Sequence, residues 1–437
     1  MNWSLAAYSI LTWAAQPLLK RKLRKRAQAE PGYAENVPER FGFYAPKDLG
    51  RDGVGQWVWV HAVSLGETRA AALLIEQLRQ VLPGMRLLLT NGTATGRAEG
   101  RKLLKPGDIQ VWQPWDSRPA VHRFLKQFQP LVGVLMETEV WPNLVNICHQ
   151  QRVPVVLANA RLNAKSLAGA QRWPSLFEPT YAALQAVWAQ TPEDQQRLQS
   201  VGAAVQGVFG NLKFDMEPEP ALIAKGAAWR AASPKPVVIL ASSREGEGMQ
   251  WLAQWEGRKF HGVAGQCQWL IVPRHPQRFD AVYQLLRDAG VRVARRSEWA
   301  EGLPPTNVDV WLGDTLGEMP LYYAAADIGI LGGSFEPLGG QNLIEAAACG
   351  CPMVLGPHTF NFAQASQRAC EVGAAFRVLD MEQGVQLATG LAHNRLELEP
   401  ARKAATTFAQ AHRGAAKATA QAIAAVVHAT KDIHPID

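Results

Sequence analysis

Residues 57–63, WVWVHAV, form a short apolar run rich in β-branched and aromatic side chains, and residues 64–68, SLGET, follow it directly. A continuous apolar run of this length is typical of a strand in a parallel sheet that is covered on both faces. Ser64 and Glu67 have the S-x-x-E spacing of a capping box, which marks the start of a helix. The stretch therefore predicts a strand followed by a crossover helix, the repeating unit of an α/β fold.

Similar runs recur along the chain and alternate with helical stretches, which is the βαβ signature of parallel sheets. The first series comprises 57–63, 86–90, 109–112, 131–136, 153–158, 187–190 and 205–209. The second comprises 237–242, 269–273, 291–294, 308–312, 328–332, 353–356 and 375–378. With 437 residues, 47% of them hydrophobic, the chain is long enough for two cores. We predict an α/β protein of two Rossmann-like, doubly wound parallel-sheet domains.

The domain boundaries follow from proline-rich segments between the two series. Residues 216–220, MEPEP, and 233–236, SPKP, are poor in strand signal, so we predict a linker over 216–236. The N-terminal domain is then expected over 27–215 and the C-terminal domain over 237–437. The alanine-rich stretch 398–430 is predicted to be a helix at the end of the second domain.

Residues 1–26 combine an apolar segment with a basic one. Residues 3–19 are uncharged and mostly apolar, and residues 20–26, KRKLRKR, hold six of the positive charges behind a net charge of +7. Because the excess charge is local, binding of nucleic acid by a whole domain is disfavoured. The basic cluster follows the apolar run and no cleavage site is visible, which favours an uncleaved membrane anchor over an interfacial helix. The positive-inside rule then places the rest of the chain on the cytoplasmic side.

The cysteines indicate a reducing compartment. The chain has five, an odd number, and no C-x-x-C pair. This pattern argues against a disulfide framework and against a structural zinc site.

Polar motifs in the second half follow strands, where doubly wound sheets bind their ligands. Residues 332–342, GGSFEPLGGQN, lead into a helix, and glycines there let backbone N–H groups approach a phosphate closely. Glu345, one turn on, can accept hydrogen bonds from ribose hydroxyls, whereas Asn342 can equally act as a plain helix cap. The spacing is not G-x-G-x-x-G, which disfavours a dehydrogenase. Glu318 follows Thr315 with capping-box spacing, so it can bind a ligand or start a helix.

The first half carries carboxylates in the corresponding places. Glu67 is a candidate general base for an attacking sugar hydroxyl, but it can also simply close the capping box with Ser64, and both readings remain open. Glu137 and Glu139 form an i, i+2 pair after the run 131–136. Lys213 and Arg244 flank the predicted linker and are candidates to stabilise negative charge on a departing phosphate.

Nine motifs taken together resemble the Kdo (3-deoxy-D-manno-octulosonic acid) transferases of Gram-negative lipopolysaccharide synthesis. In chain order they are HAVSLGET, TNGTATGR, METEVWPNL, NARLN, GNLKFD, ASSREGE, VPRHPQRF, GDTLGEM and GGQNLIEAAACG. The resemblance covers nearly the whole chain. It implies a GT-B fold and inverting transfer of Kdo from CMP-Kdo to a lipid A precursor (lipid IVA), without metal or cofactor. It also implies attachment to inner-membrane lipids through the anchor and basic arm, with the domains on the cytoplasmic side and no nucleic-acid partner.

Carried over residue by residue, the resemblance implies Glu67 as the general base, with Glu137 and Lys213 assisting the transition state. The CMP contacts that it implies are Pro273, Arg274, Gly317, Glu318, Met319, Asn342, Leu343, Ile344 and Glu345. Further candidates for the site are Ser64, Gly66, Glu139, Arg244 and His275. The family often has prolines flanking the glutamate, where this chain has Leu343, Ile344 and Ala346, so the start of that helix is left open.

Two alternatives compete with this prediction. The first is another GT-B transferase that uses a UDP-sugar on a lipid acceptor. The second is a membrane-tethered nucleotide-binding module without transfer activity, which would tolerate loss of Glu67.

Overall fold

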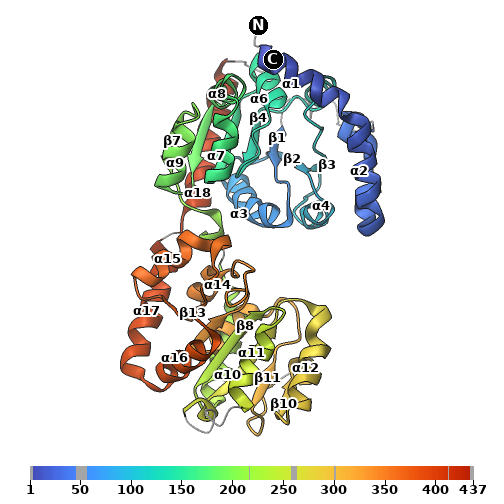
Figure 1. Cartoon of the computed structure of the whole chain (residues 1–437). Coiled ribbons are helices and arrows are strands. Elements are labelled where there is room, and N and C mark those ends of the chain that lie inside the picture. Colours follow the sequence, from blue (N-terminus) through green and yellow to red (C-terminus); the bar gives the residue numbers. More distant parts are fainter. Residues whose placement is uncertain are drawn as a thin grey trace. The chain divides into compact units, whose positions relative to one another are not determined.

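The computed structural model describes residues 3–45, 57–215, 217–256, 263–299, 302–411 and 413–433. The chain forms two compact units, the first made of Met1–Asp215 with Arg413–Asp437 and the second of Met216–His412 (Figure 1). Each unit contains one seven-stranded sheet, and every strand pairing within both sheets is parallel. The predicted class, two doubly wound α/β domains, is confirmed.

The first sheet has the strand order β3-β2-β1-β4-β5-β6-β7. Its strands are β1 (Trp57–His61), β2 (Arg86–Asn91), β3 (Ile109–Trp112), β4 (Val132–Met136), β5 (Val155–Ala160), β6 (Ala186–Ala189) and β7 (Val205–Val208). All seven fall on the predicted runs. The order reverses between β1 and β4, and this switch point is where open α/β sheets bind their ligands.

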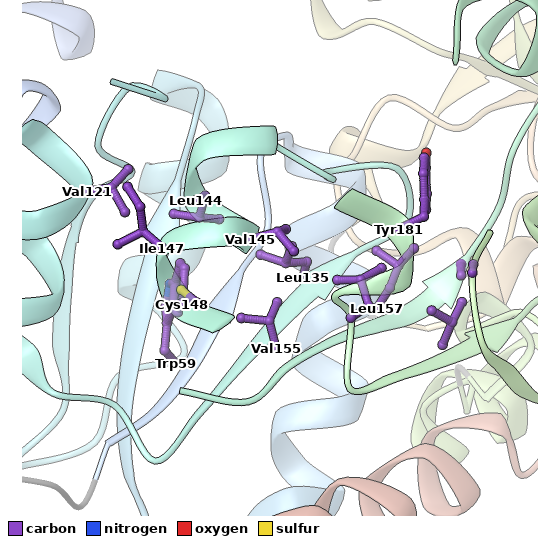
Figure 2. Packing of buried hydrophobic residues seen from close by; sticks show 14 of the residues in the cluster. Trp59, Val121, Leu135, Leu144, Val145, Ile147, Cys148, Val155, Leu157 and Tyr181 are labelled. Atoms are coloured by element: carbon purple, nitrogen blue, oxygen red, sulfur yellow. The ribbon is translucent and has the colours of Figure 1, made fainter. Parts of the chain in front are cut away.

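Side chains of β1 alternate between two core layers, which is why the whole strand is apolar. Trp57 and Trp59 pack into one layer, whereas Val58 and Val60 pack into the other. Figure 2 shows part of the first layer, where Trp59 of β1 lies near Ile147 and Cys148 of α6. Because period-two side chains are buried on both faces, a parallel strand tolerates polar residues chiefly at its ends.

The second sheet has the order β10-β11-β9-β8-β12-β13-β14, with its switch point between β8 and β12. Its strands are β8 (Val237–Ser243), β9 (Gln268–Pro273), β10 (Val293–Arg295), β11 (Val310–Leu312), β12 (Ile328–Leu331), β13 (Met353–Leu355) and β14 (Ala375–Arg377). The seven predicted runs of the second series are all found as strands.

Helices connect the strands in both units (Figure 1). Those of the first unit are α1 (Trp3–Ala14), α2 (Gln16–Ala29), α3 (Leu65–Val81), α4 (Ala94–Arg101), α5 (Arg118–Phe128), α6 (Pro142–Gln150), α7 (Ala164–Gln171), α8 (Pro174–Ala182), α9 (Pro192–Gln199) and α18 (Ala415–Ile433), with 3₁₀ turns η1 (Pro31–Ala34), η2 (Val37–Phe41) and η3 (Leu212–Asp215). Those of the second are α10 (Pro220–Ala232), α11 (Glu247–Glu256), α12 (Phe279–Asp288), α13 (Met319–Ala325), α14 (Leu343–Ala348), α15 (Ala363–Glu371), α16 (Met381–His393) and α17 (Arg395–Ala411), with 3₁₀ turns η5 (Val263–Gln266), η6 (Pro276–Arg278), η7 (Arg296–Glu298) and η8 (Phe360–Phe362).

The predicted C-terminal helix is two helices, and the last one is not part of the second domain as predicted. The stripe Ala416, Ala420, Ile423 and Val427 of α18 shares a core layer with α3 in the first unit. Asp215 accepts hydrogen bonds from the backbone N–H groups of Gly414 and Ala416, so a carboxylate holds the positive end of α18. Alanine periodicity predicts a helix but not its packing partner.

The predicted linker over 216–236 is largely a helix of the second unit; its first residue, Met216, lies outside the described residues. Pro220 stands at the start of α10, where proline has no N–H bond to lose. Gly226 and the buried Trp229 pack α10 against α13. Pro220 therefore starts a helix in a segment that was predicted to be a linker.

The predicted N-terminal anchor consists of two helices, α1 and α2, separated at Ala15. The polar side chains of α1 bond to the first unit: Ser9 Oγ donates to Asn143 Oδ1 at 2.6 Å, and Leu5 is buried. Within the described part of the chain, no helix has both the length and the apolar character needed to cross a bilayer.

We expect Gly226→Ala to destabilise the second unit. An added Cβ would lie 2.3 Å from the carbonyl oxygen of Leu321, so α10 must move away from α13, at a cost of about 1–3 kcal/mol. The matched control is Gly390→Ala in α16, where nothing lies within 4 Å and the gain in helix propensity should stabilise slightly. Urea unfolding measures both, and equal midpoints for the two variants would contradict the packing argument.

Candidate functional site

Glu67 lies at the switch point of the first sheet, in the first turn of α3. Ser64 is the N-cap residue, and its hydroxyl oxygen accepts from the Glu67 N–H at 3.4 Å. In return, Glu67 Oε2 accepts from the backbone N–H of Val63 at 2.8 Å and Oε1 accepts from the Ser64 hydroxyl at 2.9 Å. The capping box is therefore formed, and Gly66 beside it is exposed with no neighbour within 4 Å of an added Cβ.

Although Glu67 caps α3, the pKa of its carboxyl group differs from that of an ordinary glutamate. Burial raises the pKa of Glu67 to about 7, and the nearby charges of Glu137 and Glu139 add to this, against the hydrogen bonds from Val63 and Ser64. A carboxyl group with this pKa exchanges a proton near neutral pH. Geometry that caps a helix and a pKa that suits a general base coexist in one side chain.

Glu137 follows β4 in a left-handed conformation, with φ of 57°, which is uncommon for a residue with a side chain. Its carboxylate is only 3% exposed and pairs with Arg161 Nε at 2.8 Å and Lys213 Nζ at 3.7 Å. Glu139 accepts from Trp141 Nε1 at 2.8 Å, and burial raises its pKa. The charges of Glu137 and Glu139 act on Glu67, and Lys213 joins this group through Glu137; a catalytic role for these residues stays a prediction.

In the second unit, a residue without a predicted role organises the switch point. Glu247 is fully buried, and its carboxylate accepts from the backbone N–H groups of Arg244 and Gly333 at 2.8 Å and of Phe335 at 3.1 Å. It therefore holds together the loops that follow β8 and β12. Gly332 is required here because an added Cβ would lie 2.3 Å from the Ser242 carbonyl oxygen. Glu247 could have been found from the sequence, because it is an acidic residue at the start of a helix that follows a strand.

Arg274 and His275 follow the buried Pro273 at the end of β9, at the same edge of the sheet. Arg274 is exposed; its N–H donates to the Ser243 carbonyl at 3.0 Å and its Nε donates to Gln341 Oε1 at 3.0 Å. His275 is half-buried and precedes the turn η6. The structure thus joins Arg274 to the glycine-rich loop through Gln341, a residue that the prediction did not include.

The predicted capping role of Glu318 is wrong in detail. Helix α13 begins at Met319, after Gly317 in a left-handed conformation with φ of 84°, and Glu318 is its N-cap without a side-chain cap bond. Its carboxylate instead accepts from Arg296 at 2.8 Å and from the hydroxyls of Thr315 and Tyr322. Glu318 is thus fixed by side chains and shapes the loop after β11.

Helix α14 begins where the resemblance left its start open. Asn342 is the N-cap, and its Oδ1 accepts from the Ile344 N–H at 3.1 Å. Leu343 and Ile344 are buried, and Glu345 is half-buried in the first turn. The predicted cap by Asn342 is confirmed; contact of these residues with a nucleotide stays a prediction.

Known proteins similar to this chain agree with the fold and the motifs. Residues 35–216 match the family described as 3-deoxy-D-manno-octulosonic-acid transferase (kdotransferase). A 3-deoxy-D-manno-octulosonic acid transferase of Bordetella pertussis is 42% identical over 428 residues, which are 95% of this chain and 98% of the relative. The chain belongs to the 3-deoxy-D-manno-octulosonic acid transferases. The predicted resemblance is confirmed, and the protein is a glycosyltransferase.

Two further comparisons support this assignment at different levels. The Kdo transferase of Haemophilus influenzae is 31% identical over 375 residues, covering 85% of this chain and 86% of that protein. A glycosyltransferase structure from Rickettsia africae superposes with a TM-score of 0.55 at 12% identity, covering 85% of this chain and 98% of that one. The second likeness shows the GT-B fold alone. Family membership favours the Kdo transferase over both alternatives considered above.

We expect Glu67→Gln to change how stability depends on pH. The folded state keeps a proton on Glu67 between its ordinary pKa of 4.5 and about 7, whereas the unfolded state has lost it, so wild-type stability falls as pH rises through this window. Glutamine retains the cap but cannot ionise. Its stability relative to wild type should therefore rise by on the order of 1–3 kcal/mol between pH 5 and pH 8.

Urea unfolding at four pH values provides the measurement, with Glu76→Gln on the exposed face of α3 as the control. The difference between Glu76→Gln and wild type should not change with pH. A pH-independent difference for Glu67→Gln would show that the carboxyl group is already ionised at pH 5.

Proposed function

We propose that this transferase moves Kdo from CMP-Kdo to a sugar hydroxyl of a lipid A precursor, lipid IVA, in lipopolysaccharide synthesis. The observation that carries the mechanism is the carboxylate of Glu67, held at the carboxyl end of β1 with its pKa raised to about 7. The reaction is an inverting displacement. The acceptor oxygen bonds to the anomeric carbon, its proton passes to Glu67, and CMP departs from the opposite face without help from a metal.

Capping and proton transfer are compatible in Glu67. A carboxylate offers about four lone-pair sites, and the contacts with Val63 and Ser64 use two of them. The remaining sites can accept the proton of a sugar hydroxyl within hydrogen-bond distance. The fixed contacts hold the side chain in place, which supports the use of one geometry in every turnover.

Glu137 and Lys213 are proposed to assist the transition state. The carboxylate of Glu137 holds the Lys213 ammonium at 3.7 Å, and a cation held in place can stabilise the negative charge that develops on the leaving phosphate. Arg244, at the carboxyl end of β8, is proposed to stabilise negative charge on the donor phosphate within the second unit. Glu139 raises the pKa of Glu67 through its own negative charge.

The second unit is proposed to bind CMP-Kdo at its switch point, while the first binds the acceptor. The loop Gly332–Gly340 follows β12 at the edge where Arg274 lies, and the Arg274 guanidinium, which donates to Gln341 beside this loop, suits a phosphate. Pro273, Gly317, Glu318 and Met319 surround this edge, and Asn342 to Glu345 form the first turn of the next helix. Glu345 is proposed to contact the ribose.

We further propose that the first unit attaches to the cytoplasmic face of the bacterial inner membrane through α1 and α2. Trp3, Ile10 and Trp13 lie on one side of α1 and are 79%, 66% and 62% exposed. The basic residues of α2 follow directly, which suits an anionic lipid surface. The five free cysteines support a reducing compartment.

The decisive test of the function is transfer by Glu67→Gln. Purified protein, CMP-Kdo generated in place and lipid IVA are combined, and the products are read by mass. We expect wild type to add Kdo and Glu67→Gln to be slower by roughly 10²–10⁴-fold with a melting temperature no lower than that of wild type, because the cap is kept and only the proton acceptor is lost. The wild-type single-turnover rate should also rise with pH around a midpoint near 7.

Two results would contradict this assignment. If wild-type protein transfers nothing from CMP-Kdo but reacts with a UDP-sugar, the donor is a UDP-sugar and not CMP-Kdo. Transfer by Glu67→Gln within about threefold of wild type would leave Glu67 as a helix cap only.

Membrane attachment is tested by replacing Trp3, Ile10 and Trp13 with serine. Each buried apolar side chain contributes about 1.5–3 kcal/mol, so binding to vesicles containing anionic lipid should fall by at least about 10²-fold. The control is Leu396→Ser in the second unit, which is 89% exposed and far along the chain from α1. Co-sedimentation measures both, and wild-type binding by the triple variant would exclude α1 as the contact.

A further inference from the structure

A cavity of about 190 Å³ lies in the first unit between α2 and the carboxyl edge of the sheet. Residues at the ends of β1 to β4 form its inner wall, among them His61, Gly92, Gln113 and Trp141, whereas Lys22 and Arg26 come from α2. A cavity of about 150 Å³ admits a six-membered benzene ring, so this one has room for a single sugar ring.

Three buried side chains of the inner wall have polar atoms without a hydrogen-bond partner among the described residues. They are His61 Nε2, both amide atoms of Gln113 and Arg40 Nε. The three residues are 0%, 3% and 4% exposed. An unsatisfied buried polar atom costs about 1–3 kcal/mol, so three such residues around one cavity indicate a polar occupant.

The imidazole of His61 is neutral and fixed. Its Nδ1 lies 2.9 Å from Thr90 Oγ1 and 3.1 Å from the Thr90 carbonyl oxygen, and burial lowers its pKa to about 4. Nε2 is therefore left for a ligand. The Gln113 amide offers both a donor and an acceptor. Together they match hydroxyl or amide substituents on a sugar ring.

The charge of the wall favours an anion. Arg40 and Arg97 stack on the Trp112 ring, with their guanidinium carbons 3.9 and 4.6 Å from its centroid. Glu39 is buried beside them, but its Oε2 accepts from Arg97 at 3.2 Å and from the Trp112 N–H at 2.8 Å. Arg40 has no carboxylate partner in the described part of the chain and donates only to the Gly92 carbonyl, at 3.0 Å. Arg97 and Glu39 pair with each other behind the wall, so the buried cation that lines the cavity is Arg40.

We propose that this cavity binds the phosphorylated sugar head group of the acceptor, with Arg40 pairing with the phosphate and with His61 and Gln113 bonding to ring substituents. Val63 lines the cavity and also donates its N–H to Glu67, so a sugar held here lies next to the proposed base. Lys22 and Arg26 at the edge add positive charge for the same phosphate. This assignment deepens the proposed function and depends on its acceptor.

The first experiment measures binding without catalysis. The full chain is titrated with glucosamine 1-phosphate, and separately with glucosamine, inorganic phosphate and vesicles of anionic phospholipid. We expect glucosamine 1-phosphate to bind most tightly of the soluble probes and Gln113→Leu to weaken it at least tenfold. Because the Gln113 amide has no protein partner, Gln113→Leu should unfold at the wild-type denaturant concentration or above. Gln80→Leu, on the exposed face of α3, is the matched control and should bind normally.

The second experiment tests the phosphate contact through transfer. Removing the phosphates of the acceptor should lower kcat/KM of wild type by about 10–100-fold while the KM for CMP-Kdo stays the same. In Arg40→Gln the phosphorylated and dephosphorylated acceptors should react within threefold of each other, because the partner of the phosphate is gone. Should Arg40→Gln fail to fold, the same comparison in Arg26→Gln, at the exposed edge, should show a reduced phosphate effect.

The outcomes separate this proposal from the proposed function. Equal phosphate effects in wild type and in the folded arginine variants, or binding of glucosamine 1-phosphate that is unchanged by Gln113→Leu, would overturn the cavity assignment while transfer itself stands. Binding of inorganic phosphate in preference to the sugar phosphate would also overturn it. Vesicle binding is expected through α1 and α2 and should be unchanged in Gln113→Leu; a loss of vesicle binding in this variant would assign the cavity to lipid and overturn the proposal as well. Absence of Kdo transfer by wild type would refute the function, and the binding titration would still decide whether the cavity takes a phosphorylated sugar.

Discussion

Burial of both sheet faces is the constraint on which the rest of the structure depends. Each strand of the first sheet sends alternate side chains into two separate core layers, as Trp59 and Val60 do, so most positions on both faces are apolar. Polar chemistry is therefore displaced to the strand ends. In a parallel sheet these ends lie along one edge, and at the switch point two loops diverge and leave space. Glu67 and Glu137 occupy that position.

Each unit has a glutamate at its switch point, Glu67 in the first and Glu247 in the second, but the surroundings of the two carboxylates differ. In each, a glutamate in the first turn of the helix after the central strand accepts backbone N–H groups. Glu247 is fully buried and accepts from three such donors, so its carboxylate links the loops that follow β8 and β12. Glu67 has one backbone donor and one hydroxyl, and it lies near Glu137 and Glu139. Burial, together with the neighbouring negative charges, raises the pKa of Glu67 to about 7 and leaves it ready to take up a proton.

The strands and the main carboxylates could be predicted because they depend on local pattern: apolar runs for strands, and acids directly after them. Features set by packing could not. Pro220 starts α10, and only the contact of Gly226 with α13 shows that this segment belongs to a core. Likewise, His61 and Gln113 lie at strand ends among apolar residues, and only the three-dimensional structure shows that His61 Nε2 and both amide atoms of Gln113 lack partners among the described residues.

The basic arm illustrates how one segment can serve both the surface and the site. A basic segment that only fixes the orientation of a protein in a membrane requires positive charge, but the spacing of its Lys and Arg residues along the helix does not matter. In α2, however, Leu19, Lys22, Leu23 and Arg26 recur at i, i+3, i+4 and i+7, and this single face lines the cavity. Arg24 and Lys25 lie off that face and are exposed. Such spacing is expected if α2 places an apolar stripe and two cations against an acceptor head group while its other cations meet the membrane. Under this proposal, α2 would bring the acceptor to Glu67 without a separate binding domain.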